Sequence, residues 1–216
     1  DTLIPRPDTE TLVDAALAFV NGRKKARVLD LCCGTGCVGI SITRYARNPI
    51  TCTLADISSK ALKVAKENIA LNRVTGSVSA AECDAREECP TAFGTFDLIT
   101  CNPPYIPSAD IDGLDPEVKR EPRLALDGGQ DGLDLYRAIC VNFRHAIKEG
   151  GVIMFEVGID QHEQVKEIML KNGFEDIAVF KDLSGIERVV CGMVPYEITE
   201  EFEEENRTNV AENLLV

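Results

Sequence analysis

The feature that most constrains the fold of this 216-residue chain is a regular alternation of short apolar runs with amphipathic segments. Seven runs have the apolar character of buried strands, at residues 27–33, 50–56, 78–83, 96–101, 151–157, 174–180 and 187–194. Apolar residues at helical spacing fill the stretches 8–21, 37–47, 58–72, 133–148 and 161–171. This order predicts an α/β fold with a seven-stranded, mostly parallel sheet and helices on both faces. The last two runs are too close together to be joined by a helix, so we expect one antiparallel strand near the C-terminus.

Composition and charge narrow the class of protein. The chain is 44% hydrophobic and 27% charged, which is ordinary for a globular domain. We expect one domain at residues 1–195 and an acidic tail at 196–216, where seven glutamates and one arginine carry −6 of the net charge of −13. The sequence has no run long enough to span a membrane and no N-terminal signal, so we expect no membrane partner. We also do not expect direct nucleic-acid binding, because phosphate backbones are held mainly by Lys and Arg.

The cysteines indicate the compartment. Nine is an odd number, and several lie in apolar runs where a free cysteine behaves as a small hydrophobe. We therefore expect a reducing, cytoplasmic location. No metal site is predicted, because Cys32, Cys33 and Cys37 lie inside another motif and the only histidines, His145 and His162, are far from it in sequence.

That motif is a glycine-rich turn after the first strand, Cys32-Cys33-Gly34-Thr35-Gly36. Glycines at a strand end permit a tight turn and the close approach of a ligand to the backbone. Asp56 ends the second strand, at the position where an acidic residue accepts hydrogen bonds from ribose hydroxyls. Residues 34–39 also fit G-x-G-x-x-G, so the loop alone does not distinguish an NAD-dependent oxidoreductase from an enzyme that uses another adenosine cofactor.

The most unusual motif is Asn102-Pro103-Pro104-Tyr105, directly after the fourth strand. The two prolines fix the backbone and remove two N–H donors, which leaves carbonyls exposed. The Asn102 side chain adds another carbonyl acceptor, and Tyr105 adds a flat apolar face. Such a group suits a planar ligand that carries an NH₂ group.

Several further motifs, taken in order, carry a family resemblance. They are residues 4–10 (IPRPDTE), 121–126 (EPRLAL), 129–133 (GQDGL), 155–158 (FEVG) and 182–185 (DLSG) followed by Arg188. With the glycine-rich turn, Asp56 and the NPPY motif, they make nearly all of residues 3–194 resemble the catalytic domain of the bacterial peptide chain release factor N5-glutamine methyltransferases, the HemK or PrmC family. NPPY alone is shared with enzymes that methylate the amino group of adenine, but the other motifs are much more specific.

The resemblance implies a Rossmann-like, class I S-adenosylmethionine-dependent methyltransferase. Its reaction would methylate the side-chain amide nitrogen of a glutamine in a release factor, within Gly-Gly-Gln, and form S-adenosylhomocysteine. The cofactor would be bound by Cys32, Cys33, Gly34, Thr35, Gly36, Asp56, Asp84, Ala85 and Asn102. The substrate would be bound by Asn102, Pro103, Pro104, Tyr105, Arg6 and Glu10, with Asn102, Pro103 and Tyr105 as the catalytic group.

The chain also departs from the family pattern. Cys32 replaces the usual first glycine of the loop, and Ala85 stands where an aromatic residue often packs beside adenine. The family's N-terminal helical docking domain is absent from this sequence, so we expect the chain to be part of a longer protein. An adenine N6-methyltransferase remains an alternative, although Asp110, Asp112, Asp115 and Glu117 make the loop after NPPY acidic. An NAD-dependent oxidoreductase would leave NPPY unexplained.

Overall fold

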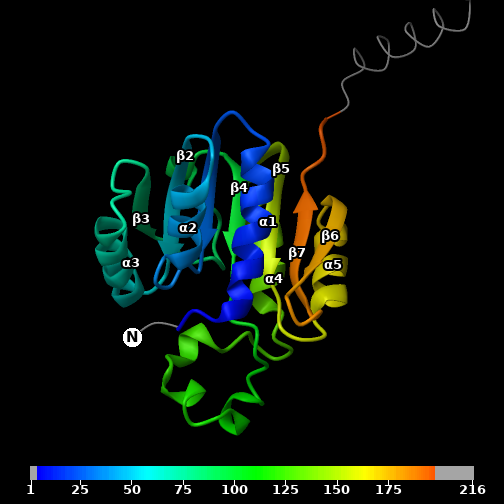
Figure 1. Cartoon of the computed structure of the whole chain (residues 1–216). Helices are drawn as coiled ribbons and strands as arrows, with labels where there is room; N and C mark the ends of the chain where they lie inside the picture. The colour runs from blue at the N-terminus through cyan, green and yellow to red at the C-terminus, as the bar shows by residue number, and fades with distance from the viewer. Residues whose placement is uncertain (1–3, 198–216) are drawn as a thin grey trace, which may run out of the picture.

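A single seven-stranded sheet forms the centre of the computed structural model, which describes residues 4–197 (Figure 1). The strands are β1 (Ala26–Leu31), β2 (Ile50–Asp56), β3 (Val78–Glu82), β4 (Phe96–Cys101), β5 (Ile147–Glu156), β6 (Glu175–Lys181) and β7 (Glu187–Met193). Their order in the sheet is β3-β2-β1-β4-β5-β7-β6. Neighbouring strands are parallel except that β7 runs antiparallel to β5 and β6. The predicted sheet, with one antiparallel strand near the C-terminus, is therefore confirmed.

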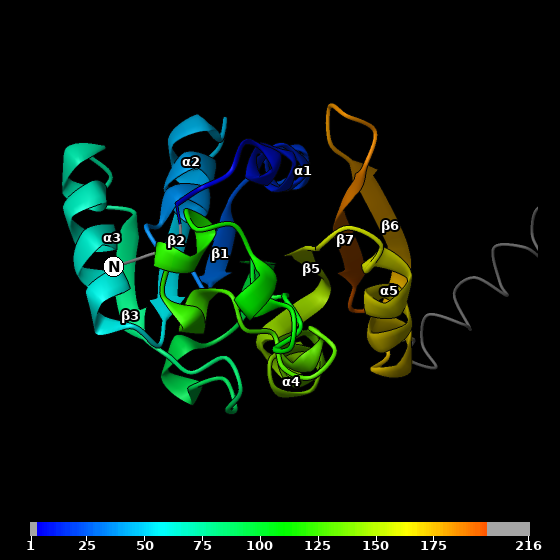
Figure 2. The same cartoon turned by 90° about the horizontal axis from the view of Figure 1, so that it is seen from below.

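Five α-helices in the described part of the chain cover the two faces of the sheet. They are α1 (Glu10–Asn21), α2 (Cys37–Tyr45), α3 (Ser59–Leu71), α4 (Asp134–Asn142) and α5 (His162–Lys171). The buried residues of α1, α2 and α3 share one apolar cluster with one face of the strands, and those of α4 and α5 share a second cluster with the other face. Figure 2 shows α1 and α2 on one side of the sheet and α4 on the opposite side. The prediction of helices on both faces is confirmed.

One predicted boundary is wrong. The helix expected at 133–148 ends at Asn142, and a 3₁₀ turn, η6 (Arg144–Ala146), leads directly into β5 at Ile147. Gly150 has φ +65° and lies within β5, where the register with β4 shifts between Phe96 and Leu98. β5 therefore begins four residues before the predicted strand start at residue 151, and Gly150 belongs to an irregularity inside this longer strand.

The glycine-rich turn brings α2 close to the sheet. Gly39 lies in α2, and a Cβ at this position would be 2.7 Å from the Cys52 sulfur and even closer to the Leu54 side chain, both on β2. Only glycine permits this approach, so the last glycine of residues 34–39 has a packing role. This contact fixes the turn at the carboxyl end of β1.

Residues 106–131, here called the cap segment, cross the carboxyl edge of the sheet. The segment contains three 3₁₀ turns, η3 (Ile111–Gly113), η4 (Val118–Arg120) and η5 (Arg123–Ala125). Its two ends are joined by a bridge between Ile106 and Asp127 and by hydrogen bonds from Ile106 N to Leu126 O (3.0 Å) and from Gly128 N to Ile106 O (2.8 Å). Figures 1 and 2 show this segment in green against the strand ends. It therefore covers the edge at which the NPPY motif and the glycine-rich turn lie.

Within residues 4–197, no helix has the length and apolar character that a membrane crossing needs. The predicted acidic tail lies outside the described residues from position 198 onward.

Candidate active site

A cavity of about 520 Å³ opens at the carboxyl ends of β1 to β4. The strand order reverses between β1 and β4, which is where ligands bind in open parallel sheets. Its volume suits a small-molecule cofactor. Of the residues predicted to bind cofactor or substrate, those that line it are Cys32, Gly34, Asp56, Asp84, Ala85, Asn102 and Pro104.

A second, smaller cavity of about 40 Å³ adjoins the first. Its lining includes the predicted loop residues Cys33 and Thr35, and it shares Cys32, Gly34 and Asn102 with the larger cavity. Asn102 therefore stands where the two cavities meet. Gly36 lines neither one; it has φ +77° and occupies the N-cap position of α2.

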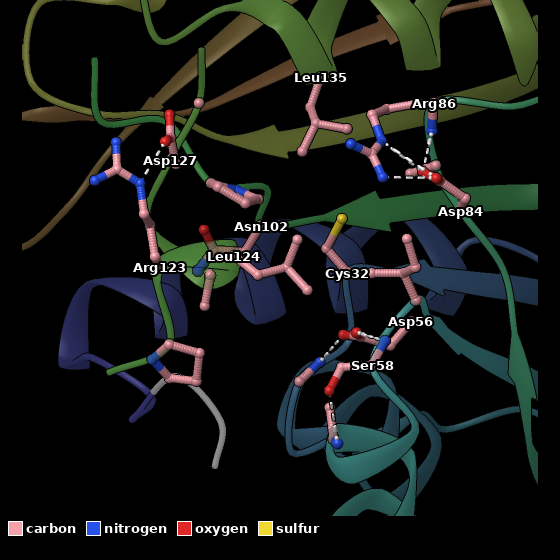
Figure 3. A pocket seen from close by; sticks show the side chains of 18 of the residues that line it. Cys32, Asp56, Ser58, Asp84, Arg86, Asn102, Arg123, Leu124, Asp127 and Leu135 are labelled. Carbon is pink, nitrogen blue, oxygen red and sulfur yellow. Dashed lines mark hydrogen bonds and ion pairs between the residues drawn. The ribbon is translucent and has the colours of Figure 1, made fainter. Parts of the chain in front are cut away.

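Asp56 is held firmly at the cavity wall. Its Oδ2 accepts a hydrogen bond from Gly34 N (2.9 Å) and its Oδ1 accepts one from Ser58 N (2.8 Å), as Figure 3 shows. Each carboxylate oxygen can accept a further bond, so Asp56 can bind a pair of hydroxyls. Ser58 in turn caps α3 by accepting a bond from Ala61 N, as its place before the helix predicts.

Asp84 and Ala85 form the part of the wall beyond β3. The Arg86 side chain binds the Asp84 carboxylate with both Nε (2.9 Å to Oδ1) and Nη2 (2.7 Å to Oδ2). The hydrogen bonds from Arg86 lower the pKa of Asp84, so this carboxyl is ionised at neutral pH. Ala85 is buried and lines the cavity, in the place where the family often has an aromatic residue.

The backbone of Cys32, which stands where the family pattern has a glycine, is strained. It has φ +52°, in the left-handed region that favours glycine, and its side chain faces the middle of the large cavity (Figure 3). Its substitution for the family's glycine therefore carries a backbone cost and places a sulfur atom in the cavity.

The four residues of the NPPY motif have different surroundings. The Asn102 amide nitrogen lies 3.5 Å from the Thr9 hydroxyl, so the side-chain oxygen Oδ1 is the end available to accept another hydrogen bond. Pro104 lines the large cavity, whereas Pro103 is buried and lines neither cavity. Tyr105 also lines neither; it packs against the core, and its backbone oxygen accepts a bond from Gln161 Nε2 (3.0 Å). Burial, together with the nearby Glu156 carboxyl, raises the pKa of Tyr105.

Arg6 and Glu10, predicted to contact substrate, line neither cavity. Arg6 Nη2 pairs with Glu121 Oε1 at 2.7 Å and thereby fastens the N-terminal segment to the cap segment. Glu10 is exposed in the first turn of α1. Their predicted contact with substrate has no support from the cavity walls and stays a prediction.

Sequence reasoning missed part of the cavity wall. The omitted residues come from β2 and α3, from the end of β3, from the cap segment and from α4: Ile57, Ser58, Ala61, Cys83, Arg86, Pro122, Arg123, Leu124, Ala125, Asp127, Gly128, Gly129, Asp134 and Leu135. Figure 3 shows Leu124 near Asn102, with Asp56 and Asp84 on one side and Arg123 paired with Asp127 on the other. A signal for part of this set was present, because Pro122, Arg123, Leu124 and Ala125 lie in the 121–126 motif and Gly129 begins the 129–133 motif.

All nine cysteines are free. In residues 4–197, His, Cys, Asp and Glu side chains form no group of three suited to a metal ion.

Comparison with known proteins identifies the family to which the chain belongs. The family model of the methyltransferase small domain matches residues 9–113. A release factor glutamine methyltransferase of Clostridium acetobutylicum is 39% identical over 192 residues, covering 88% of this chain and 67% of the relative. The chain belongs to the release factor glutamine methyltransferase family. A relative of the same name from Clostridium botulinum is 40% identical over 189 residues, covering 87% of this chain and 66% of the relative. The chain thus spans about two thirds of the length of these relatives.

The fold agrees with this membership. A methyltransferase of known structure from Pyrococcus furiosus superimposes with a TM-score of 0.67 at 15% identity, covering 91% of this chain and 86% of that one. The predicted family and the class I methyltransferase fold are confirmed.

Proposed function

We propose that this chain transfers a methyl group from S-adenosylmethionine to the side-chain amide nitrogen (N5) of a glutamine in a peptide chain release factor. The products would be the methylated glutamine, S-adenosylhomocysteine and a proton, which leaves the amide nitrogen for solvent after the methyl group has been transferred. The observation that carries the proposal is the position of Asn102, at the meeting point of the two cavities with its amide nitrogen directed at Thr9. The resemblance to the family implies that the glutamine belongs to a Gly-Gly-Gln sequence.

The two cavities fit the parts of the cofactor. Asp56 offers acceptors for ribose hydroxyls, and Asp84 and Ala85 lie where adenine would pack. Cys32, Cys33, Gly34 and Thr35 surround the smaller cavity, which suits the methionyl end. When bound, S-adenosylmethionine supplies a methyl group made electrophilic by its sulfonium. Asn102 borders both spaces, so it would lie beside the reacting methyl and the incoming amide.

The chemistry requires orientation more than a strong base. The lone pair of an amide nitrogen is delocalised into the carbonyl, so the nitrogen is a poor nucleophile. Asn102 Oδ1 and the Pro103 carbonyl would accept the two amide hydrogens and turn the nitrogen toward the methyl group. The same two dipoles stabilise the positive charge that grows on nitrogen. Orientation of this kind is worth about 7–11 kcal/mol in favourable cases. Tyr105 lines neither cavity, so its packing against the flat amide stays a prediction.

Charge near the site favours a protein substrate over a nucleic acid. Asp110, Asp112, Asp115 and Glu117 are all exposed on the cap segment, which also supplies part of the cavity wall. A base-extruding enzyme needs a basic track for the phosphate backbone at this place. The nine free thiols suit the reducing conditions of the cytoplasm, where release factors act.

The test is an incubation with radiolabelled S-adenosylmethionine in three arms. The first holds a release factor, the second holds the same factor with the Gly-Gly-Gln glutamine replaced by alanine, and the third holds duplex DNA. Label in the first arm alone, located on that glutamine by mass spectrometry, is expected. Label on DNA would favour the adenine alternative and contradict the proposal.

A further inference from the structure

A buried carboxyl group, that of Glu156, lies next to Asn102 at the carboxyl edge of the sheet. Glu156 is the last residue of β5, and Phe155 pairs with Cys101 of β4, so Glu156 and Asn102 follow side by side at the strand ends. Glu156 is only 3% exposed, and its Oε2 is buried without a hydrogen-bond partner in the described part of the chain. Burying a carboxyl group with an unpaired acceptor costs free energy, so Glu156 lowers the stability of the folded state. It lines neither cavity and would not touch substrate.

Thr9 lies between this carboxyl and the NPPY motif. It is 5% exposed and occupies the N-cap position of α1, where its sequence context predicts a helix cap. Its side chain makes no capping bond. Instead the hydroxyl accepts a hydrogen bond from Asn102 Nδ2 at 3.5 Å. Both residues lie close enough to Glu156 to act as donors that lower the pKa of its carboxyl.

These contacts distinguish the two ends of the Asn102 amide. An ionised carboxylate only accepts hydrogen bonds, so the Asn102 NH₂ faces Glu156 and Thr9 and the Oδ1 faces away from them. Turning the amide over would put Oδ1 against the carboxylate oxygen and leave the NH₂ toward the substrate. In that orientation Asn102 would offer donors where the glutamine amide also offers donors.

We propose that Glu156, together with Thr9, is a positioning residue that locks the Asn102 side chain with Oδ1 toward the substrate amide. The inference rests on the proposed function for its kinetic consequence, but the orientation itself is a property of the chain without substrate. It assigns a role to a buried carboxylate that the reaction does not use directly.

The lock depends on the charge of Glu156. Burial raises the pKa of Glu156 to about 7, while hydrogen bonds from Thr9 and Asn102 and the charge of Arg188 act in the opposite direction. A protonated Glu156 could donate to Asn102 Oδ1 and so stabilise the turned amide. Turnover should therefore fall as the pH falls through about 7. The other titratable or charged groups near Glu156 come from η1 (Pro7–Thr9), α2, the NPPY motif, α4 and β7: Asp8, Cys37, Tyr105, Tyr136 and Arg188.

The test compares Glu156→Gln with the wild-type chain on the release-factor substrate. Glutamine keeps the shape of the side chain but removes its charge, and it can turn either its amide oxygen or its NH₂ group toward Asn102. We expect kcat to fall roughly 10- to 100-fold, the value of a hydrogen bond to a charged group. The affinity for S-adenosylmethionine, read by calorimetry, should stay within a few-fold, and the loss of turnover below pH 7 should disappear. Glu163→Gln, which removes an exposed charge on α5, is the matched charge control.

A second pair of variants keeps the test usable if Glu156→Gln does not fold. Thr9→Val removes the hydroxyl with little change in shape and should also lower kcat, whereas Thr9→Ser retains the hydroxyl and should keep more of the turnover. In NMR spectra of the chain without substrate, the Asn102 side-chain amide signals should shift with a midpoint near pH 7, and Glu156→Gln should abolish that shift.

The outcomes separate the inference from the proposed function. Wild-type kcat and an unchanged pH profile in Glu156→Gln or Thr9→Val would overturn the positioning role while leaving the function intact. A wild-type chain that transfers no methyl group to the release factor would refute the function. The NMR titration would then still decide the orientation of Asn102: a shift lost in Glu156→Gln supports the lock, and a shift shared by both chains overturns it.

Discussion

Replacing Glu156 by glutamine should make the fold more stable at neutral and alkaline pH, because the buried carboxylate opposes folding. Burial raises the pKa of this carboxyl from 4.5 to about 7. Below about pH 4.5 the group is protonated in both the folded and the unfolded states and contributes no pH dependence. As the pH rises toward 7, the unfolded chain loses the proton first, so the folded state loses stability relative to it.

The size of the effect follows from this difference in pKa. A gap of about 2.5 units corresponds to about 3 kcal/mol of unfolding free energy lost between acid and neutral pH. Glutamine does not titrate, so the variant escapes this loss. Burial also raises the pKa of Asp30 to about 7. Asp30 titrates in both chains, so its contribution cancels when the unfolding free energy of the wild type is subtracted from that of the variant at each pH. The difference between variant and wild type should therefore grow with pH and level off above about pH 8.

The assay is urea unfolding of both chains from pH 5 to 8.5 at constant ionic strength and without cofactor. The exposed-charge variant Glu163→Gln should follow the wild-type curve and serves as the reference. Parallel curves for Glu156→Gln and the wild type would refute the reasoning, because they would show that Glu156 titrates alike in both states. A stability gain accompanied by a lower kcat would show that the chain retains a destabilising carboxylate for its effect on Asn102.

Two further predictions concern the cofactor site and the fold that supports it. Asp56→Ala should weaken S-adenosylmethionine binding roughly 10- to 100-fold, because it removes charged hydrogen bonds to the ribose, and calorimetry would read this. Unchanged affinity would show that Asp56 does not bind the ribose of the cofactor. Gly39→Ala should destabilise the chain by about 1–3 kcal/mol, since its Cβ would press on Cys52 and Leu54. A melting temperature equal to that of the wild type would show that α2 can shift away from β2 at no cost.

The fold was predictable because its signals are local. Strand ends at Asp56 and Cys101 are marked by the residues that follow them, and both strands have the predicted bounds. The helix end predicted at residue 148 is wrong: Gly150, two residues later, bends a strand, although glycine is also common just after a helix. Local pattern alone could not choose between these two roles.

The supporting contacts of the site were not predictable in this way. The hydrogen bond between Asn102 and Thr9 joins residues 93 positions apart, and the Arg6–Glu121 pair spans 115 positions. No spacing in the sequence encodes such pairs. A threonine before a helix usually caps it, and only the fold shows that the Thr9 hydroxyl makes no capping bond and lies against Asn102 instead.

The central claim is that Asn102 presents an acceptor to a glutamine amide, and the Asn102→Ala variant tests it most directly. S-adenosylmethionine binding by calorimetry and methyl transfer to the release factor should be measured on the same preparation. The account predicts cofactor affinity within a few-fold of the wild type and no detectable methylation. Undiminished turnover in this variant would contradict the assigned role of Asn102.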